Sequence, residues 1–169
     1  MSLRPAAALA AALAAVLACD AGLEPEPICP RGLVGLCGTL HFRGAIPDST
    51  AAVAVVAYAT FPQSCNDLFT FQPLIPPSVP YADSVAAYSL PLPPGRYEWV
   101  LAVWRKTYPP LTLTVADTAV LREAGHFRNP ADTSQPGAVT VPSGGFTGGV
   151  DFVVDFDRLR PVSYYFTCP

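Results

Sequence analysis

Three aspartates near the C-terminal end of the chain have the residue type and spacing of a candidate cation site. Asp151, Asp155 and Asp157 alternate with apolar residues, so an extended segment would turn them to one face. Residues two apart on such a face lie roughly 7 Å apart, which would let Asp155 and Asp157 share Ca²⁺. Calcium loops normally supply more oxygen ligands at turn spacing, and an acidic strand face that discourages edge pairing is the simpler interpretation. The sequence therefore predicts neither a bound metal nor a cofactor.

The two histidines are the candidates for acid–base catalysis. His41 lies close to Arg43, and His126 follows Arg122 and Glu123. A histidine with a nearby carboxylate can act as a general base. However, no serine or cysteine stands in a nucleophile motif such as Gly-x-Ser-x-Gly. We expect both histidines at the surface and a protein that is not an enzyme, with a small hydrolase as the least favoured alternative.

Four of the five cysteines form an even set that suits disulfide bonding in an oxidising compartment. Four cysteines permit three connectivities. We favour a Cys29–Cys37 bond, which closes a short loop, and a Cys65–Cys168 bond, which pins a long loop to the C-terminal tail. Their spacings match no zinc motif, so disulfides are favoured over metal ligation.

The remaining cysteine, Cys19, ends an N-terminal apolar run. Arg4 precedes the apolar residues 6–17, and Val16-Leu17-Ala18-Cys19 resembles the lipobox of bacterial lipoproteins. The run is shorter than the roughly 20 residues that cross a bilayer. The resemblance implies a helical signal peptide over residues 1–18 and a lipid, such as palmitate, on Cys19. The alternatives are a signal peptide cut elsewhere and an uncleaved buried helix.

A lipid on Cys19 implies a membrane-anchored protein outside the cytoplasm, either periplasmic or on the cell surface. Residues 19–35 then form a flexible tether rich in Pro, Gly and Glu, followed by one domain over residues 36–169. The formal net charge is −3 and the chain has no basic cluster, which argues against nucleic acid as a partner.

The domain has the pattern of an all-β fold, because the 20 prolines of the chain disfavour helices. Apolar and polar residues alternate with the period of a strand, and strands are predicted at residues 36–43, 84–92, 96–106, 111–121, 138–141 and 147–157. The continuous apolar run at residues 51–60 predicts a central strand. Turn residues separate these segments, so we expect an antiparallel Greek-key β-sandwich of seven to eight strands.

Aromatic residues offer a route to binding instead of catalysis. Trp104 lies on the more polar face of its predicted strand, and Tyr81 and Tyr108 lie in nearby loops. Exposed aromatic rings stack on sugars or anchor protein partners. The favoured alternative packs Trp104 under the irregular residues 61–83 or under a second layer. Within residues 61–83 we also expect a short edge strand at residues 68–72. The aromatic residues 164–166 form either an exposed patch or a tail folded back on the domain.

Several segments resemble the transthyretin-like, carboxypeptidase-regulatory-like β-sandwiches. The resemblance rests on Gly38-Thr39-Leu40, on residues 51–60 and on residues 88–97, and it covers residues 36–157. In that family a Pro-Gly hairpin, here residues 92–97, joins two strands. The resemblance implies a small accessory module that is structural or binds a partner. The enzymatic members, the hydroxyisourate hydrolases, end in Tyr-Arg-Gly-Ser, and this chain lacks that tail.

These observations together predict a lipid-anchored, extracytoplasmic β-sandwich that acts as a binding or structural module of the cell envelope. Its expected contacts are the membrane, through the lipid, and a protein or glycan partner. The alternative is a glycan-binding accessory lipoprotein that uses Trp104, Tyr81 and Tyr108.

Overall fold

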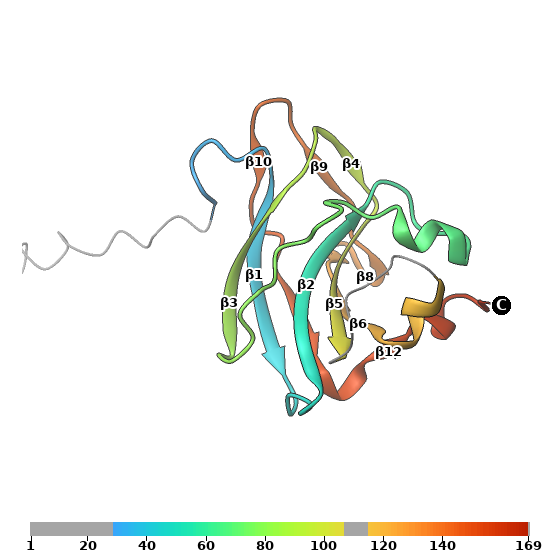
Figure 1. The fold of residues 1–169 in the computed structure, drawn as a ribbon. Helices are drawn as coiled ribbons and strands as arrows, with labels where there is room; N and C mark the ends of the chain where they lie inside the picture. The colour runs from blue at the N-terminus through green and yellow to red at the C-terminus, as the bar shows by residue number, and fades with distance from the viewer. Residues whose placement is uncertain (1–28, 107–114, 169) are drawn as a thin grey trace, which may run out of the picture.

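The computed structural model describes residues 29–106 and 115–168, which form mainly β-strands (Figure 1). These residues contain twelve strands, four 3₁₀ helices and no α-helix, which confirms the all-β prediction. The number of strands exceeds the expected seven to eight because several are only two or three residues long.

The first sheet is built around β1 (Gly35–Arg43). On one side β1 pairs antiparallel with β3 (Val85–Pro91). On the other side it pairs with β10 (Phe146–Thr147) and β11 (Phe152–Asp155), and both of these pairings are parallel. The purely antiparallel arrangement expected from the sequence is therefore wrong for this edge, where the late strands run in the direction of β1.

The second sheet has the order β12-β6-β5-β2 and is antiparallel throughout. Its strands are β2 (Thr50–Tyr58), β5 (Trp99–Lys106), β6 (Leu121–His126) and β12 (Arg160–Pro161).

The apolar strand β2 lies at the end of the second sheet and not in its centre. Its outer edge is covered by the segment after β2, because Ala57 and Gln72 exchange backbone hydrogen bonds of 2.9 and 2.8 Å and the Val79 amide donates to Val53 at 2.8 Å. From Val55 to Tyr58 both faces of β2 are also buried, which suits its continuously apolar sequence.

The main hydrophobic core fills the space between the two sheets. It includes nearly inaccessible side chains from both, among them Leu36, Leu40, Leu90, Val53, Val55, Val100 and Val154. The inward set predicted for the last strand is confirmed, since Val150, Phe152, Val154 and Phe156 are all buried. The predicted strand is interrupted between Thr147 and Phe152, and it ends at Asp155 because residues Phe156–Arg158 form a 3₁₀ helix.

The proline-rich segment before Tyr97 is not a hairpin turn. It joins β3 of the first sheet to β4 (Gly95–Tyr97), and β4 pairs with β9 (Val139–Val141) instead of β3. The Tyr97 hydroxyl donates to the Pro93 carbonyl at 2.9 Å and fixes this crossing. A further small ribbon pairs β7 (Arg128–Asn129) with β8 (Asp132–Pro136).

Two predicted strands are partly helical. Residues Val115–Ala119 form a 3₁₀ helix before β6, so the predicted strand at residues 111–121 begins only at Leu121; residues 111–114 lie outside the described residues. Residues Cys65–Phe69 form another 3₁₀ helix, and of the edge strand expected at residues 68–72 only the Gln72 bridge exists.

Both favoured disulfides are present. Cys29 bonds to Cys37 with a Cα–Cα distance of 5.5 Å, and Cys65 bonds to Cys168 with 5.6 Å. The second bond links the 3₁₀ helix Cys65–Phe69 to the C-terminal segment.

The predicted signal peptide and Cys19 lie outside the described residues, as does most of the tether. Within the part of the chain that the structure describes, no helix has the length and apolar character to cross a membrane.

Candidate functional site

The central strand β5 is apolar on both faces, and this places a site on the outer face of the second sheet. Val100, Ala102 and Trp104 point into the main core. The alternating residues Trp99 and Leu101 are equally buried, at 3 % and 4 % exposure, but they join a second cluster with Val56 and Tyr58 on the opposite face. An apolar outer face of this kind requires a third layer to cover it.

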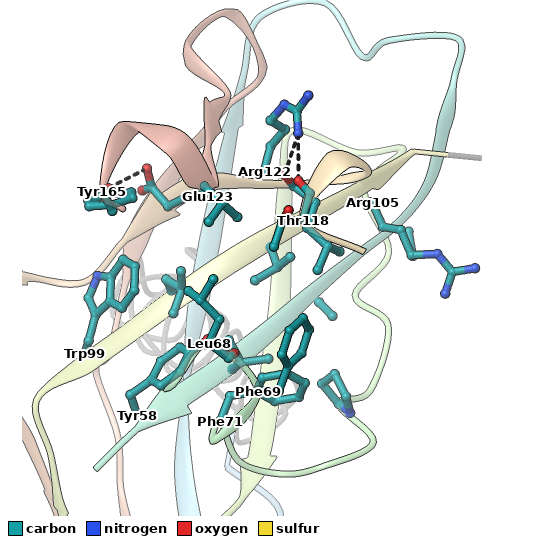
Figure 2. Close-up of a pocket in the computed structure, with 18 of the residues that line it drawn as sticks. Tyr58, Leu68, Phe69, Phe71, Trp99, Arg105, Thr118, Arg122, Glu123 and Tyr165 are labelled. Carbon is teal, nitrogen blue, oxygen red and sulfur yellow. Dashed lines mark hydrogen bonds between the residues drawn. The ribbon is translucent and has the colours of Figure 1, made fainter. Parts of the chain in front are cut away.

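The third layer consists of the segment between β2 and β3 and the C-terminal segment, and it encloses an apolar pocket of about 470 Å³ (Figure 2). The floor is the outer face of β2, β5 and β6. On β2 the floor residues Ala52 and Ala54 are small, which leaves space beneath Leu68, Phe69 and Phe71. Val162, Tyr165 and Phe166 line it from the C-terminal side.

Aromatic rings form one wall of the apolar pocket. The Trp99 ring lies 5.5 Å from Tyr58, 4.8 Å from Phe61 and 5.4 Å from Tyr165 between ring centroids. The Tyr58 hydroxyl donates to the Leu68 carbonyl at 2.6 Å and so ties the covering segment to the floor. Burial raises the pKa of Tyr58, so this hydroxyl stays a donor.

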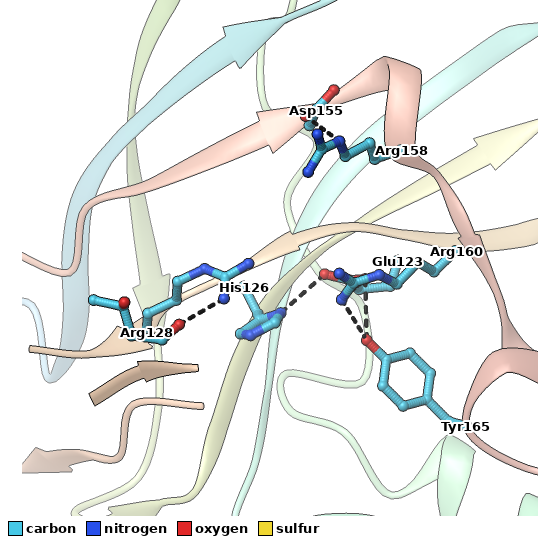
Figure 3. Close-up of polar contacts among 8 residues, drawn as sticks. Glu123, His126, Arg128, Asp155, Arg158, Arg160 and Tyr165 are labelled. Carbon is cyan, nitrogen blue, oxygen red and sulfur yellow. Dashed lines mark hydrogen bonds and ion pairs between the residues drawn. The ribbon is translucent and has the colours of Figure 1, made fainter. Parts of the chain in front are cut away.

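A buried polar cluster lies beside this wall (Figure 3). The Glu123 side chain, only 6 % exposed, contacts His126 Nδ1 at 3.0 Å and Arg160 Nη1 at 3.4 Å. The Tyr165 hydroxyl donates to Glu123 Oε2 at 3.1 Å. Burial, the largest cause, raises the pKa of Tyr165 to about 12. The cluster therefore fixes the C-terminal segment against β6.

A bulge in β6 brings Glu123 and His126 to the same face. Residues three apart on a regular strand face opposite sides. Here Glu123 is opposite Val103 and His126 is opposite Leu101, with a register shift between them. Both side chains therefore share the outer face with the apolar pocket, while Ala124 turns into the main core.

A second pocket, of about 570 Å³, lies on the other side of Trp99 and Tyr165, which line both cavities. Its lining combines aromatic side chains with polar ones, which include His126 and three arginines: Arg96, Arg128 and Arg160. We call this cavity the polar pocket.

The aromatic residues predicted to bind a ligand are not exposed together. Trp104 is 6 % exposed and its indole N–H donates to Thr50 Oγ1 at 2.8 Å, because its face of β5 is the core face. A sugar therefore cannot stack on it. Tyr81 is half-buried and donates to the Thr50 carbonyl at 3.3 Å, and Tyr108 lies outside the described residues.

The two histidines lie in different sheets. His41 is exposed on β1, as predicted. The prediction was wrong for His126, which is 8 % exposed because it lies on β6 and not in a polar loop. The structure does not bring these histidines into one site.

Asp151 and Asp155, two aspartates of the candidate cation site, each contact other groups of the protein. Asp155 accepts a hydrogen bond of 3.1 Å from the Asp157 amide and pairs with Arg158 at 3.8 Å, while Asp157 lies in the 3₁₀ helix. Asp151 instead accepts from the Thr39 amide at 2.7 Å. Among the described residues no group of three or more His, Cys, Asp or Glu side chains could hold a metal ion.

Sequence reasoning placed Glu123 near His126 and singled out residues 164–166, but it did not bring Arg160 and Tyr165 to Glu123, from which they are 37 and 42 residues away in the chain. The available signal was β5, whose two apolar faces indicate a covering layer on each side. Comparisons with known proteins found no family model, no curated protein and no solved structure that matches this chain.

Proposed function

We propose that this protein is a binding module without catalytic activity that holds a small apolar ligand in the apolar pocket. The observation that carries the proposal is the pocket itself, since its volume of about 470 Å³ lies in the range of about 300–1,000 Å³ typical of small-molecule sites. Its lining is dominated by aliphatic and aromatic side chains, which favour a hydrocarbon ligand.

The walls of the pocket support a small ligand in preference to a protein partner. The Cys65–Cys168 bond joins the two segments that cover the floor, and the Tyr58 hydroxyl holds one of them at Leu68. Walls fixed in this way lower the ordering cost of binding. Leu74 and Ile75, which are 61 % and 87 % exposed, also line the pocket and provide an apolar rim.

The proposal includes the location and family expected from the sequence. Two disulfides suit an oxidising compartment, and the lipobox-like segment at Cys19 suits a membrane-anchored lipoprotein of the cell envelope. Greek-key connectivity and kinship with transthyretin-like accessory modules belong to the same proposal.

A hydrolase has less support. His126 Nδ1 contacts Glu123, as in an oriented catalytic base, but among the described residues no serine or cysteine is hydrogen-bonded to this imidazole.

The test is binding of a fluorescent fatty acid, 11-(dansylamino)undecanoic acid, to the purified full chain. We expect micromolar binding with a blue-shifted emission. Ala54→Phe fills the floor and should weaken binding by about tenfold or more, which is about 1.4 kcal/mol. Ala87→Phe is the matched control, because Ala87 is exposed on β3 of the first sheet.

Circular dichroism melting of both variants verifies that they fold. No binding by the unsubstituted protein, or equal binding by a folded Ala54→Phe variant, would overturn the proposal.

A further inference from the structure

The polar pocket concentrates positive charge in an acidic protein. Its lining contains three of the ten basic residues of the chain, Arg96, Arg128 and Arg160, and one acidic residue, Glu98, while the whole chain has a formal net charge of −3. These arginines come from β4, β7 and β12, so only the tertiary fold brings them together. Such a concentration favours an anionic ligand.

Each of the three guanidinium groups is held by the protein through Nη1. Arg128 donates to the Thr133 carbonyl at 2.6 Å, Arg96 pairs with Glu98 at 2.8 Å and Arg160 contacts Glu123 at 3.4 Å. Within the described part of the chain, the Nε and Nη2 groups of these three arginines make no hydrogen bond. Anchored guanidinium groups with unused N–H donors match the two oxygens of a carboxylate.

His126 adds a hydrogen-bonding group of the other kind. Its Nδ1 atom contacts the buried Glu123 carboxylate, which fixes the ring orientation (Figure 3). The ring lines the polar pocket, and its Nε2 atom makes no hydrogen bond to the described residues. In a neutral imidazole with the proton on Nδ1, Nε2 accepts a hydrogen bond. The Gln135 side-chain carbonyl is a second acceptor in the lining. These acceptors suit hydroxyl groups.

An exposed ring supplies a stacking surface in the same pocket. Tyr164 is 63 % exposed, and the Arg160 guanidinium lies 4.9 Å from its ring centroid. Phe61 and Tyr165 extend the aromatic lining. Aromatic faces of this kind pack against the apolar faces of sugar rings.

We propose that the polar pocket binds a sugar acid, that is, a hydroxylated ring bearing a carboxylate. The arginines pair with the carboxylate, His126 Nε2 and Gln135 accept from ring hydroxyls, and Tyr164 packs against the ring. This site lies away from Trp104, and the Trp99–Tyr165 wall separates it from the apolar pocket.

The test is calorimetric titration of the purified full chain with D-glucuronic acid, compared with D-glucose, which lacks the carboxylate, and with benzoate, which lacks the hydroxyls. We expect glucuronic acid to bind at least about tenfold more tightly than either comparison ligand. Arg128→Gln and Tyr164→Ala should each weaken glucuronic acid binding by about tenfold. Arg158→Gln is the matched control and should leave binding unchanged, because that side chain is 81 % exposed outside the pocket.

Arg128 also holds the β7–β8 ribbon through Thr133, so Arg128→Gln could weaken binding by loosening that ribbon. Tyr164→Ala tests the pocket without removing this contact. Equal binding of glucose and glucuronic acid, absence of glucuronic acid binding, or an equal loss in Arg158→Gln would overturn the proposal. Benzoate binding as tight as that of glucuronic acid would overturn the assignment to a sugar.

Discussion

Glu123 shows how a single buried charge can organise a surface of this protein. Its carboxylate is surrounded by the imidazole of His126, the guanidinium of Arg160 and the hydroxyl of Tyr165. A buried carboxylate is tolerated when its partners compensate for lost hydration. Arg160 and Tyr165 belong to the C-terminal segment, so this residue joins the last part of the chain to the second sheet.

Replacing Glu123 with alanine should destabilise the protein by about 1–3 kcal/mol, because His126 and the partly buried Arg160 would lose their acceptor. Urea unfolding followed by tryptophan fluorescence measures the change, since Trp99 lies next to the cluster. Asp83→Ala is the control, because Asp83 is exposed and should change stability by less than about 0.5 kcal/mol. Equal stability of the Glu123→Ala and Asp83→Ala proteins would contradict the role given to Glu123.

At the scale of elements, the 3₁₀ helix Cys65–Phe69 carries Leu68 and Phe69 over the apolar pocket. Its first turn is closed by Asp67, whose Oδ2 accepts from the Ser64 hydroxyl and from the amides of Gln63 and Ser64. A 3₁₀ helix this short depends on such local contacts more than on propensity. The disulfide at Cys65 then fixes the same turn to the C-terminal segment.

The Asp67 turn should loosen in acid. The Ser64 hydroxyl, followed by the Gln63 amide, holds the pKa of Asp67 below its ordinary value of 3.8. A lowered folded-state pKa stabilises the turn above pH 3.8, and this contribution is lost as the pH falls through the lower folded-state value. An NMR titration of the Asp67 carboxyl carbon measures it.

Ser64→Ala should move the Asp67 titration upward toward the ordinary value, whereas Ser84→Ala, at an exposed position on another segment, should leave it unchanged. A titration of Asp67 that is the same in the Ser64→Ala and unsubstituted proteins would show that the hydroxyl is not the main cause.

At the scale of the whole molecule, the two pockets share one face of the fold. Both lie on the outer side of the second sheet, separated by Trp99 and Tyr165. The first sheet carries His41 and the Cys29–Cys37 bond, from which the chain leads back toward Cys19.

Substitution of Cys19 with serine tests the anchor. If Cys19 carries a lipid, Cys19→Ser should move the protein from the membrane fraction to the soluble fraction of a bacterial host, because the acyl chains supply the attachment. Fractionation with immunoblotting measures the shift. Arg31→Ala is a control near the end of the tether that should stay with the membrane, and a Cys19→Ser protein that remains there would contradict lipid anchoring.

Much of the fold could be predicted because it depends on local pattern. The alternation of Val150, Phe152 and Val154 identifies an inward face, and the predicted face is buried. The favoured pairing of the four cysteines, with one bond closing a short loop and the other joining a long loop to the C-terminal tail, is the pairing in the structure. The apolar run of β2 predicted a central strand, but β2 lies at the end of its sheet, where a loop and not a further strand covers its edge.

The candidate sites depend on information that local pattern lacks. Alternation separates the two faces of β5, but only the packing of the sheets decides that Trp104 enters the core while Trp99 faces the pockets. The bulge in β6 turns His126 to the same face of the sheet as Glu123. A one-residue shift of this kind leaves no periodic signal in the sequence.

The sequence by itself determined the all-β class and the inward face of residues 150–156, because these follow from residue type and from period-two alternation, and it favoured the disulfide pairing that the structure has. The tertiary structure decided where function can reside. The apolar pocket exists because the segment after β2 and the C-terminal segment meet over one face of the second sheet. The polar pocket exists because arginines from three separate strands converge beside His126, a meeting that depends on long-range packing and not on spacing in the chain.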